Sequence, residues 1–201
     1  MENTSVITLK EFSFPIPDRR ILHRIGYKSR TAKINPVVKE MIGNNRLKLE
    51  ALLQPGAVFR ILDYADTNHH SIFEGAVKVA LCVCTIGPEL ERSSAELISN
   101  NEMLQGFVMD AYGSEAAEEV AWQADAAIVE TARKLNLWPS KRFSPGYGQW
   151  ELEEQRYIFA MLPASDIGVE LTETCMMIPR KSVSFRINLY AEKEQTTRSF
   201  R

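Results

Sequence analysis

Residues 77–86 read VKVALCVCTI, an almost uninterrupted apolar run that ends at Gly87-Pro88. A short apolar run bounded by turn residues is typical of a strand inside a sheet. Because the run is apolar almost throughout, we expect it to be the central strand. Just before it, residues 57–62 read AVFRIL and predict another strand.

The segments around this strand predict the rest of the fold. Strand-like runs cover 6–14, 167–177 and 182–190, and helical signals cover 18–26, 36–54, 88–100, 102–137 and 151–162. Helices and strands come in groups rather than in strict alternation, which favours the α+β class, a mainly antiparallel twisted sheet covered by helices. No glycine-rich phosphate loop follows a strand, and this disfavours a doubly wound nucleotide-binding fold.

The longest helical signal, 102–137, places apolar residues at mixed spacings of three and four. Gly106 and Gly113 lie inside it, and each glycine costs helix stability by about 1 kcal/mol relative to alanine. Gly113 is followed by the small residues Ala116, Ala117 and Ala121. We therefore expect another element to approach the helix closely at this point.

Composition limits the class of protein. A chain of 201 residues can bury one good core, so we expect a single domain over 1–201, with a frayed polar tail at 192–201. The 45% hydrophobic and 25% charged fractions are those of a soluble globular protein, and the net charge of -2 gives no reason to expect nucleic acid as a partner. We see neither an apolar run of the roughly eighteen residues that a membrane helix needs nor a signal peptide, and we expect a cytoplasmic protein.

Cysteine and histidine offer two weak metal-site patterns. Cys82 and Cys84 face the same way on the central strand, and with Cys175 they could form a thiolate site. Buried reduced thiols that act as small hydrophobes are the commoner arrangement. His69-His70 lies in a polar loop, but no cysteine or histidine stands near it at zinc-site spacing. We therefore assign no metal ligands.

The stretch RFSPGY at residues 142–147 carries the strongest chemical signal. Arg142 offers a forked cation that can hold a carboxylate or phosphate in two places. Pro145 and Gly146 predict a tight turn, and Tyr147 adds a ring and a hydroxyl. The pattern fits a site for a small zwitterionic or anionic ligand, and its alternative is a surface turn with a structural arginine.

Two blocks resemble a known family. The first is Arg142-x-x-Pro145-Gly146-Tyr147, and the second is GVELTETCMMIP at 168–179, followed by KSVS at 181–184. In this order and at this separation they resemble the C-terminal activation domain of cobalamin-dependent methionine synthase. The upstream match is looser and rests on the long helix.

The resemblance implies a repair function. That family binds S-adenosylmethionine and supports reductive methylation of inert cob(II)alamin, with an electron from a flavodoxin-like donor. The chain has no zinc site for homocysteine and no cobalamin-binding motif, so the resemblance implies a subunit that acts on a separate cobalamin-binding methionine synthase. A non-catalytic module that binds S-adenosylmethionine or another corrinoid protein is the alternative. A protein built on a cysteine metal site is a third possibility.

The resemblance also assigns roles in the arginine turn. Arg142 is expected to take the ligand carboxylate in a bidentate pair. Ser144 and Gly146 are expected to offer backbone groups to the adenine edge, and Tyr147 to stack on or bond to the ligand. In this scheme the protein positions the methyl donor and supplies no catalytic acid or base.

Two acids complete the implied site. The family uses one on the long helix, where the resemblance points to Glu118, with Glu115 one turn earlier as the alternative. It uses an aspartate near the start of the domain, for which Asp18 is the counterpart, although Asp18 also fits a helix N-cap.

One segment departs from the family pattern. Residues 148–154 read GQWELEE where the family has Pro-Ala-Cys-Pro-x-His-Thr, close to the corrin. The resemblance therefore implies S-adenosylmethionine binding more strongly than contact with cobalamin.

Overall fold

The computed structural model describes residues 5–29, 33–43, 46–66, 75–148 and 150–192. Five strands form one sheet in the order β1-β2-β3-β7-β4, and every neighbouring pair is antiparallel. Their bounds are β1 Ile7–Leu9, β2 Gly56–Asp63, β3 Lys78–Thr85, β7 Ser182–Tyr190 and β4 Trp138–Phe143. The predicted antiparallel sheet and its central strand, β3, are confirmed.

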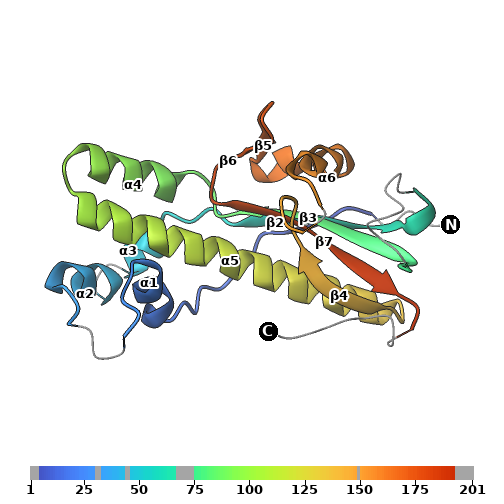
Figure 1. The fold of residues 1–201 in the computed structure, drawn as a ribbon, viewed down its shortest axis with the longest axis horizontal. Coiled ribbons are helices and arrows are strands. Elements are labelled where there is room, and N and C mark those ends of the chain that lie inside the picture. The colour runs from blue at the N-terminus through green and yellow to red at the C-terminus, as the bar shows by residue number, and fades with distance from the viewer. Residues whose placement is uncertain (1–4, 30–32, 44–45, 67–74, 149, 193–201) are drawn as a thin grey trace.

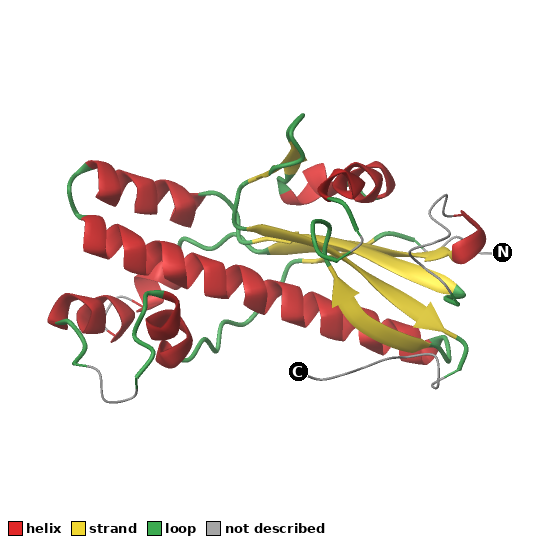
Figure 2. Ribbon diagram, viewed as in Figure 1, coloured by secondary structure: helices red, strands yellow, loops and turns green. Residues whose placement is uncertain are grey.

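Helices cover both faces of this sheet (Figures 1 and 2). One face carries the long helix α5, Met103–Lys134. Around the part of α5 that extends beyond the sheet lie α1 Asp18–Arg24, α2 Pro36–Gly43, α3 Arg46–Glu50 and α4 Glu89–Ser99. The other face carries α6, Gln155–Met161, and the short 3-10 helix η3, Ala164–Ile167. At about 1.5 Å per residue, α5 is long enough to pass along the whole sheet.

Burial on both faces explains why β3 is apolar at almost every position. Cys82 and Cys84 belong to the core between the sheet and α5, while Leu81 and Val83 belong to a second core beneath α6. Side chains alternate between the faces of a strand, so a strand covered on both sides needs apolar residues at nearly every position.

Glycines let α4 lie close against α5, as the run of small residues predicted. A β-carbon added at Gly113 would lie 2.5 Å from Leu90 Cδ2, and one added at Gly106 would lie 2.5 Å from Ile98 Cγ1 and 2.9 Å from the carbonyl oxygen of Ser94. The Ser94 hydroxyl also donates a hydrogen bond of 2.9 Å to the carbonyl of Gly106. The two helices therefore have no room for a side chain here.

Three predicted elements differ in the structure, and the first of them, the strand over 6–14, is confined to β1, Ile7–Leu9. The expected helix over 36–54 is divided into α2 and α3, and residues 44–45 between them lie outside the described part. The expected strand over 167–177 is wrong: η3 begins it, and only the short strands β5, Glu170–Leu171, and β6, Met177–Ile178, are extended. Gly168 and Cys175 have positive φ angles of 70° and 60°, which no continuous strand contains.

Strand β4 was not predicted, because Pro139 and polar residues obscure its alternation. The 3-10 helices η1 Tyr64–Asp66 and η2 Leu152–Glu154 complete the elements described. Residues 193–201 of the predicted tail lie outside the described part. Across the described segments, every helix is too short or too polar to span a lipid bilayer.

Replacing Gly106 with alanine tests the close approach of α4. The added methyl meets the Ser94 backbone at 2.9 Å, so Gly106→Ala should lower the free energy of unfolding by about 1–3 kcal/mol, although alanine favours helix. Gly43 in α2 faces open space, so Gly43→Ala should leave stability unchanged or raise it by about 0.5 kcal/mol. Urea unfolding monitored by circular dichroism compares the two variants, and equal midpoints would contradict the packing described.

Candidate functional site

Arg142 reaches from the sheet to α5. In the β4–β7 pair, Arg142 lies opposite Ile187, which is part of the core under α5. Its guanidinium carbon lies 5.7 Å from the centre of the Phe185 ring, and its Nη2 donates a hydrogen bond of 2.5 Å to Glu118 Oε2 on α5. The structure therefore brings together two of the predicted site residues, Arg142 and Glu118.

Of the two terminal nitrogens of Arg142, this pair engages only Nη2. Its Nη1 is buried and has no hydrogen-bond partner among the described residues. The side chains of Arg142 and Glu118 are 24% and 37% exposed, so the pair is open to solvent on one side. A buried donor without a partner costs about 1–3 kcal/mol, and an acceptor that reached Nη1 would remove this cost.

Glu115, the alternative to Glu118, has a different environment. Its Oε2 accepts a hydrogen bond of 2.5 Å from Arg20 Nε, and its Oε1 accepts one of 2.6 Å from Arg24 Nε. The Glu115 side chain is only 8% exposed. Burial lowers the pKa of Arg20, but its bonds to Glu115 and Glu119 outweigh this effect and raise it. Glu115 thus ties α1 to α5, and Glu118 is the acid that faces Arg142.

The turn after β4 is held by its own backbone. Gly146 and Gly148 have positive φ angles of 85° and 64°. The Gly146 N–H donates to the Trp150 carbonyl at 2.7 Å, and the Trp150 N–H donates to the Tyr147 carbonyl at 3.2 Å. Trp150 is buried, whereas Tyr147 is 77% exposed. The turn therefore presents the Tyr147 ring to solvent, while the Gly146 N–H, one of the backbone groups of the predicted site, is bonded within the turn.

A buried arginine, Arg186, anchors this turn from the other face of the sheet. Arg186 on β7 pairs with Phe143, and its guanidinium lies 5.0 Å from the Phe143 ring and 4.8 Å from the Trp150 ring. Its Nη1 donates a hydrogen bond of 2.9 Å to Asn188 Oδ1. Burial lowers the pKa of Arg186 to about 10, so it remains charged at neutral pH. Arg186 was not predicted as a functional residue. The sequence marks it only as a cation inside the predicted strand 182–190.

Asp18 is not joined to this site. It is the first residue of α1, the cap position is Pro17, and no side-chain cap bond forms, so the predicted N-cap role of Asp18 is wrong. Its exposed carboxylate lies 3.6 Å from Nη1 of Arg46 on α3. The described contacts thus link Asp18 to α3 rather than to Arg142.

The cysteines are buried thiols. Burial, reinforced by the neighbouring Cys84, raises the pKa of Cys82 well above its usual range. Cys175 is also buried and free. Over the described residues, no cluster of three or more histidine, cysteine or acidic side chains is placed to hold a metal ion. His69 and His70 lie outside the described part.

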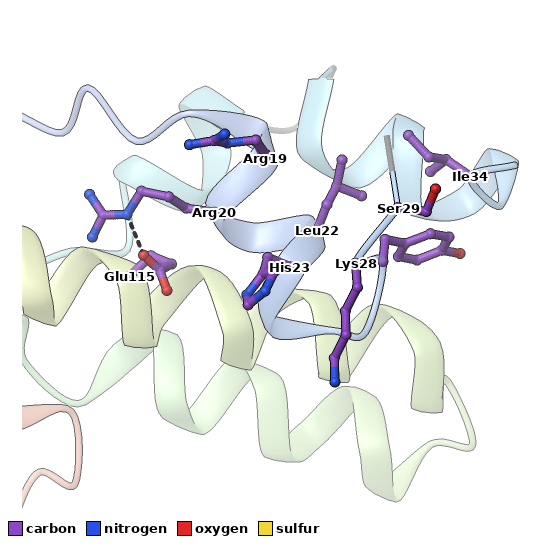
Figure 3. A pocket seen from close by; sticks show the side chains of 9 residues that line it. Arg19, Arg20, Leu22, His23, Lys28, Ser29, Ile34 and Glu115 are labelled. Atoms are coloured by element: carbon purple, nitrogen blue, oxygen red, sulfur yellow. Dashed lines mark hydrogen bonds and ion pairs between the residues drawn. The ribbon is translucent and has the colours of Figure 1, made fainter. Parts of the chain in front are cut away.

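A cavity of about 720 Å³ has Glu115 in its lining, three positions before Glu118 on α5. It is lined by residues from α1, from the loop that follows α1 and from α5, where Glu115 contributes (Figure 3). Arg142 is not among its lining residues. The structure therefore separates the predicted arginine site from this cavity.

Fold and site together define an α+β domain in which a long helix and a sheet edge present an arginine–glutamate pair. Residues 98–197 match the family described as "Vitamin B12 dependent methionine synthase, activation domain". This part of the chain contains α5, the arginine turn and both blocks. The family predicted from those blocks is confirmed.

A solved structure extends the comparison to almost the whole chain. It is titled "Crystal Structure of the MetH Reactivation Domain bound to AdoHcy", and it covers 95% of this chain and 80% of its own, with a TM-score of 0.63 and 15% sequence identity. At this identity the likeness establishes the fold. No curated protein sequence matches the chain.

Substituting the two acids of α5 separates their roles. Glu115→Gln removes a charge that two arginines share at a buried position, so it should lower the free energy of unfolding by about 2–3 kcal/mol. Glu118 belongs to a more exposed pair, so Glu118→Gln should change it by less than about 1 kcal/mol. Thermal and urea unfolding measure both, and a larger loss in Glu118→Gln would reverse the assignment.

The Arg186 anchor can be tested by fluorescence. The chain has 3 tryptophans, so replacing Trp122 and Trp138 with phenylalanine leaves Trp150 as the only emitter. In this background Arg186→Leu should shift Trp150 emission to longer wavelength and raise its quenching by acrylamide, because the ring loses its cation. Arg186→Lys keeps the charge but not the planar group, and should give an intermediate result. Unchanged quenching in Arg186→Leu would show that the turn is held without Arg186.

Proposed function

We propose that this chain binds S-adenosylmethionine and serves as the reactivation module of a cobalamin-dependent methionine synthase, acting in trans as a separate subunit. The family match and the fold support this proposal. The observation that carries it is the half-used Arg142–Glu118 pair, in which the buried Nη1 of Arg142 has no partner among the described residues.

The pair is complementary to the amino-acid end of the ligand. This end carries an α-carboxylate and an α-ammonium side by side. Arg142 would bind the carboxylate through Nη1, where a charge-assisted hydrogen bond replaces a buried donor without a partner. Glu118, which is more exposed than Arg142, would take the ammonium. Charges of opposite sign then alternate around the site.

The turn would hold the remainder of the ligand. Tyr147 offers an exposed ring for stacking, and Ser144 and Gly146 would contact the adenine edge through backbone groups other than the Gly146 N–H, which Trp150 occupies. Asp18 is bound to Arg46 in this structure, so it would have to leave that contact to take part.

The ligand would supply a methyl group to cobalamin that a partner protein carries, after an electron from a flavodoxin-like donor. The residues of this chain would only bind and orient the donor, which lowers the barrier by proximity. The altered segment 148–154 makes a simple binding module, for this or another corrinoid protein, the alternative.

Calorimetry with S-adenosylmethionine tests the site. Arg142→Ala should weaken binding by about 2–4 kcal/mol, because it removes a charge-assisted contact at a partly buried position. Glu118→Gln should weaken it less, and Arg133→Ala, an exposed change on the same helix, should have no effect. Binding that is unaltered in Arg142→Ala would refute the proposed site.

Absorbance then separates repair from binding. A cobalamin-binding methionine synthase without its own activation domain is oxidised to cob(II)alamin and mixed with a reductant and S-adenosylmethionine. We expect conversion to the methylated form only when this chain is present, and slower conversion with Arg142→Ala. Binding without any conversion would favour the simple binding module.

A further inference from the structure

The cavity between α1 and α5 is lined by different residues from those of the Arg142 turn (Figure 3). At about 720 Å³ it falls within the range of roughly 300–1,000 Å³ that small-molecule sites occupy. Its lining residues are Arg19, Arg20, Leu22, His23, Tyr27, Lys28, Ser29, Ile34 and Glu115. None of them belongs to the Arg142 turn.

The lining carries an excess of positive charge. Arg19, Arg20 and Lys28 are cations, whereas Glu115 is the acid of the lining and both of its oxygens are already bonded to Arg20 and Arg24. This excess stands out in a chain whose net charge is -2. The cavity therefore attracts anions and repels cations.

Three of the polar side chains are available to a ligand. Those of Arg19, His23 and Lys28 make no hydrogen bond or ion pair with any residue that the structure describes. Arg19 and His23 stand four positions apart on α1, a spacing that places them on one face of the helix. Their donors suit the oxygens of a phosphate group, which accepts several charge-assisted hydrogen bonds at once.

The rest of the lining is apolar or aromatic. Leu22, Tyr27 and Ile34 are half-buried beside the charged groups. They provide a surface against which a ring or an aliphatic group can rest while the phosphate meets the cations.

The cavity is unsuited to the ligand proposed for the Arg142 turn. The sulfonium of S-adenosylmethionine is a cation, and Arg19, Arg20 and Lys28 would repel it. Glu115 and Glu118 are three positions apart on α5, so the two sites are neighbours with opposite preferences. We propose that the α1–α5 cavity is a second site, which binds a small molecule bearing a phosphate group attached to a ring.

Calorimetry on the full chain at low salt tests this site with two probes, inorganic pyrophosphate and ADP. Both should bind, and ADP should bind more tightly if the apolar wall holds its ring. The double variant Arg19→Gln/Lys28→Gln should weaken each probe by about tenfold or more. Absence of binding to the unaltered chain, or equal affinity for the two probes, would overturn the proposal.

The matched control removes one arginine and one lysine elsewhere, as Arg92→Gln/Lys39→Gln on α4 and α2. This control should leave the affinities for pyrophosphate and ADP unchanged. A loss of affinity equal to that of Arg19→Gln/Lys28→Gln would overturn the proposal, because it would show that overall charge causes the effect. All four side chains are exposed, so both double variants should keep the urea midpoint of the parent. Saturating S-adenosylmethionine should not displace ADP, and displacement would show one shared site. Failure of S-adenosylmethionine to bind would refute the proposed function and leave this test intact.

Discussion

The structure depends on the burial of β3 from both sides. Cys82 and Cys84 face α5, and Leu81 and Val83 face the helices of the opposite layer, so β3 joins two cores. A strand in this position cannot accept a charge on either face without a large cost. With β3 fixed at the centre, β7 pairs beside it and β4 beyond β7, which places Arg142 at the sheet edge beneath α5.

Two glutamates of α5, Glu115 and Glu118, have different contacts. Glu115 points to α1 and is enclosed by Arg20 and Arg24, whereas Glu118 points to β4 and shares solvent with Arg142. Residues three positions apart on a helix point in directions that differ by only a small rotation about its axis. This small difference separates the buried contact of Glu115 from the more open contact of Glu118. The partners decide the role of each acid, and the helical pattern alone does not.

Sequence reasoning found the elements whose signals are local. The apolar run of β3, the length of α5 and the close approach at Gly113 all follow from residue types within one element. It missed what depends on distant pairing: Arg20 bonds to Glu115 across 95 positions. Arg186 was missed for a similar reason, since a cation in a strand resembles a surface residue until the rings of Phe143 and Trp150 enclose it.

The difference in exposure between the two ion pairs bears on ligand entry. A pair that is partly open to solvent contributes about 1 kcal/mol, so a ligand at the proposed site would open the Arg142–Glu118 contact at little cost and bind each partner with its own charges. Opening the contacts of Glu115 would leave a buried carboxylate without its arginines, at a cost of several kcal/mol. In the proposed site, Arg142 and Glu118 would therefore exchange their mutual contact for contacts with a zwitterionic ligand, while Glu115 and its two arginines keep α1 in place.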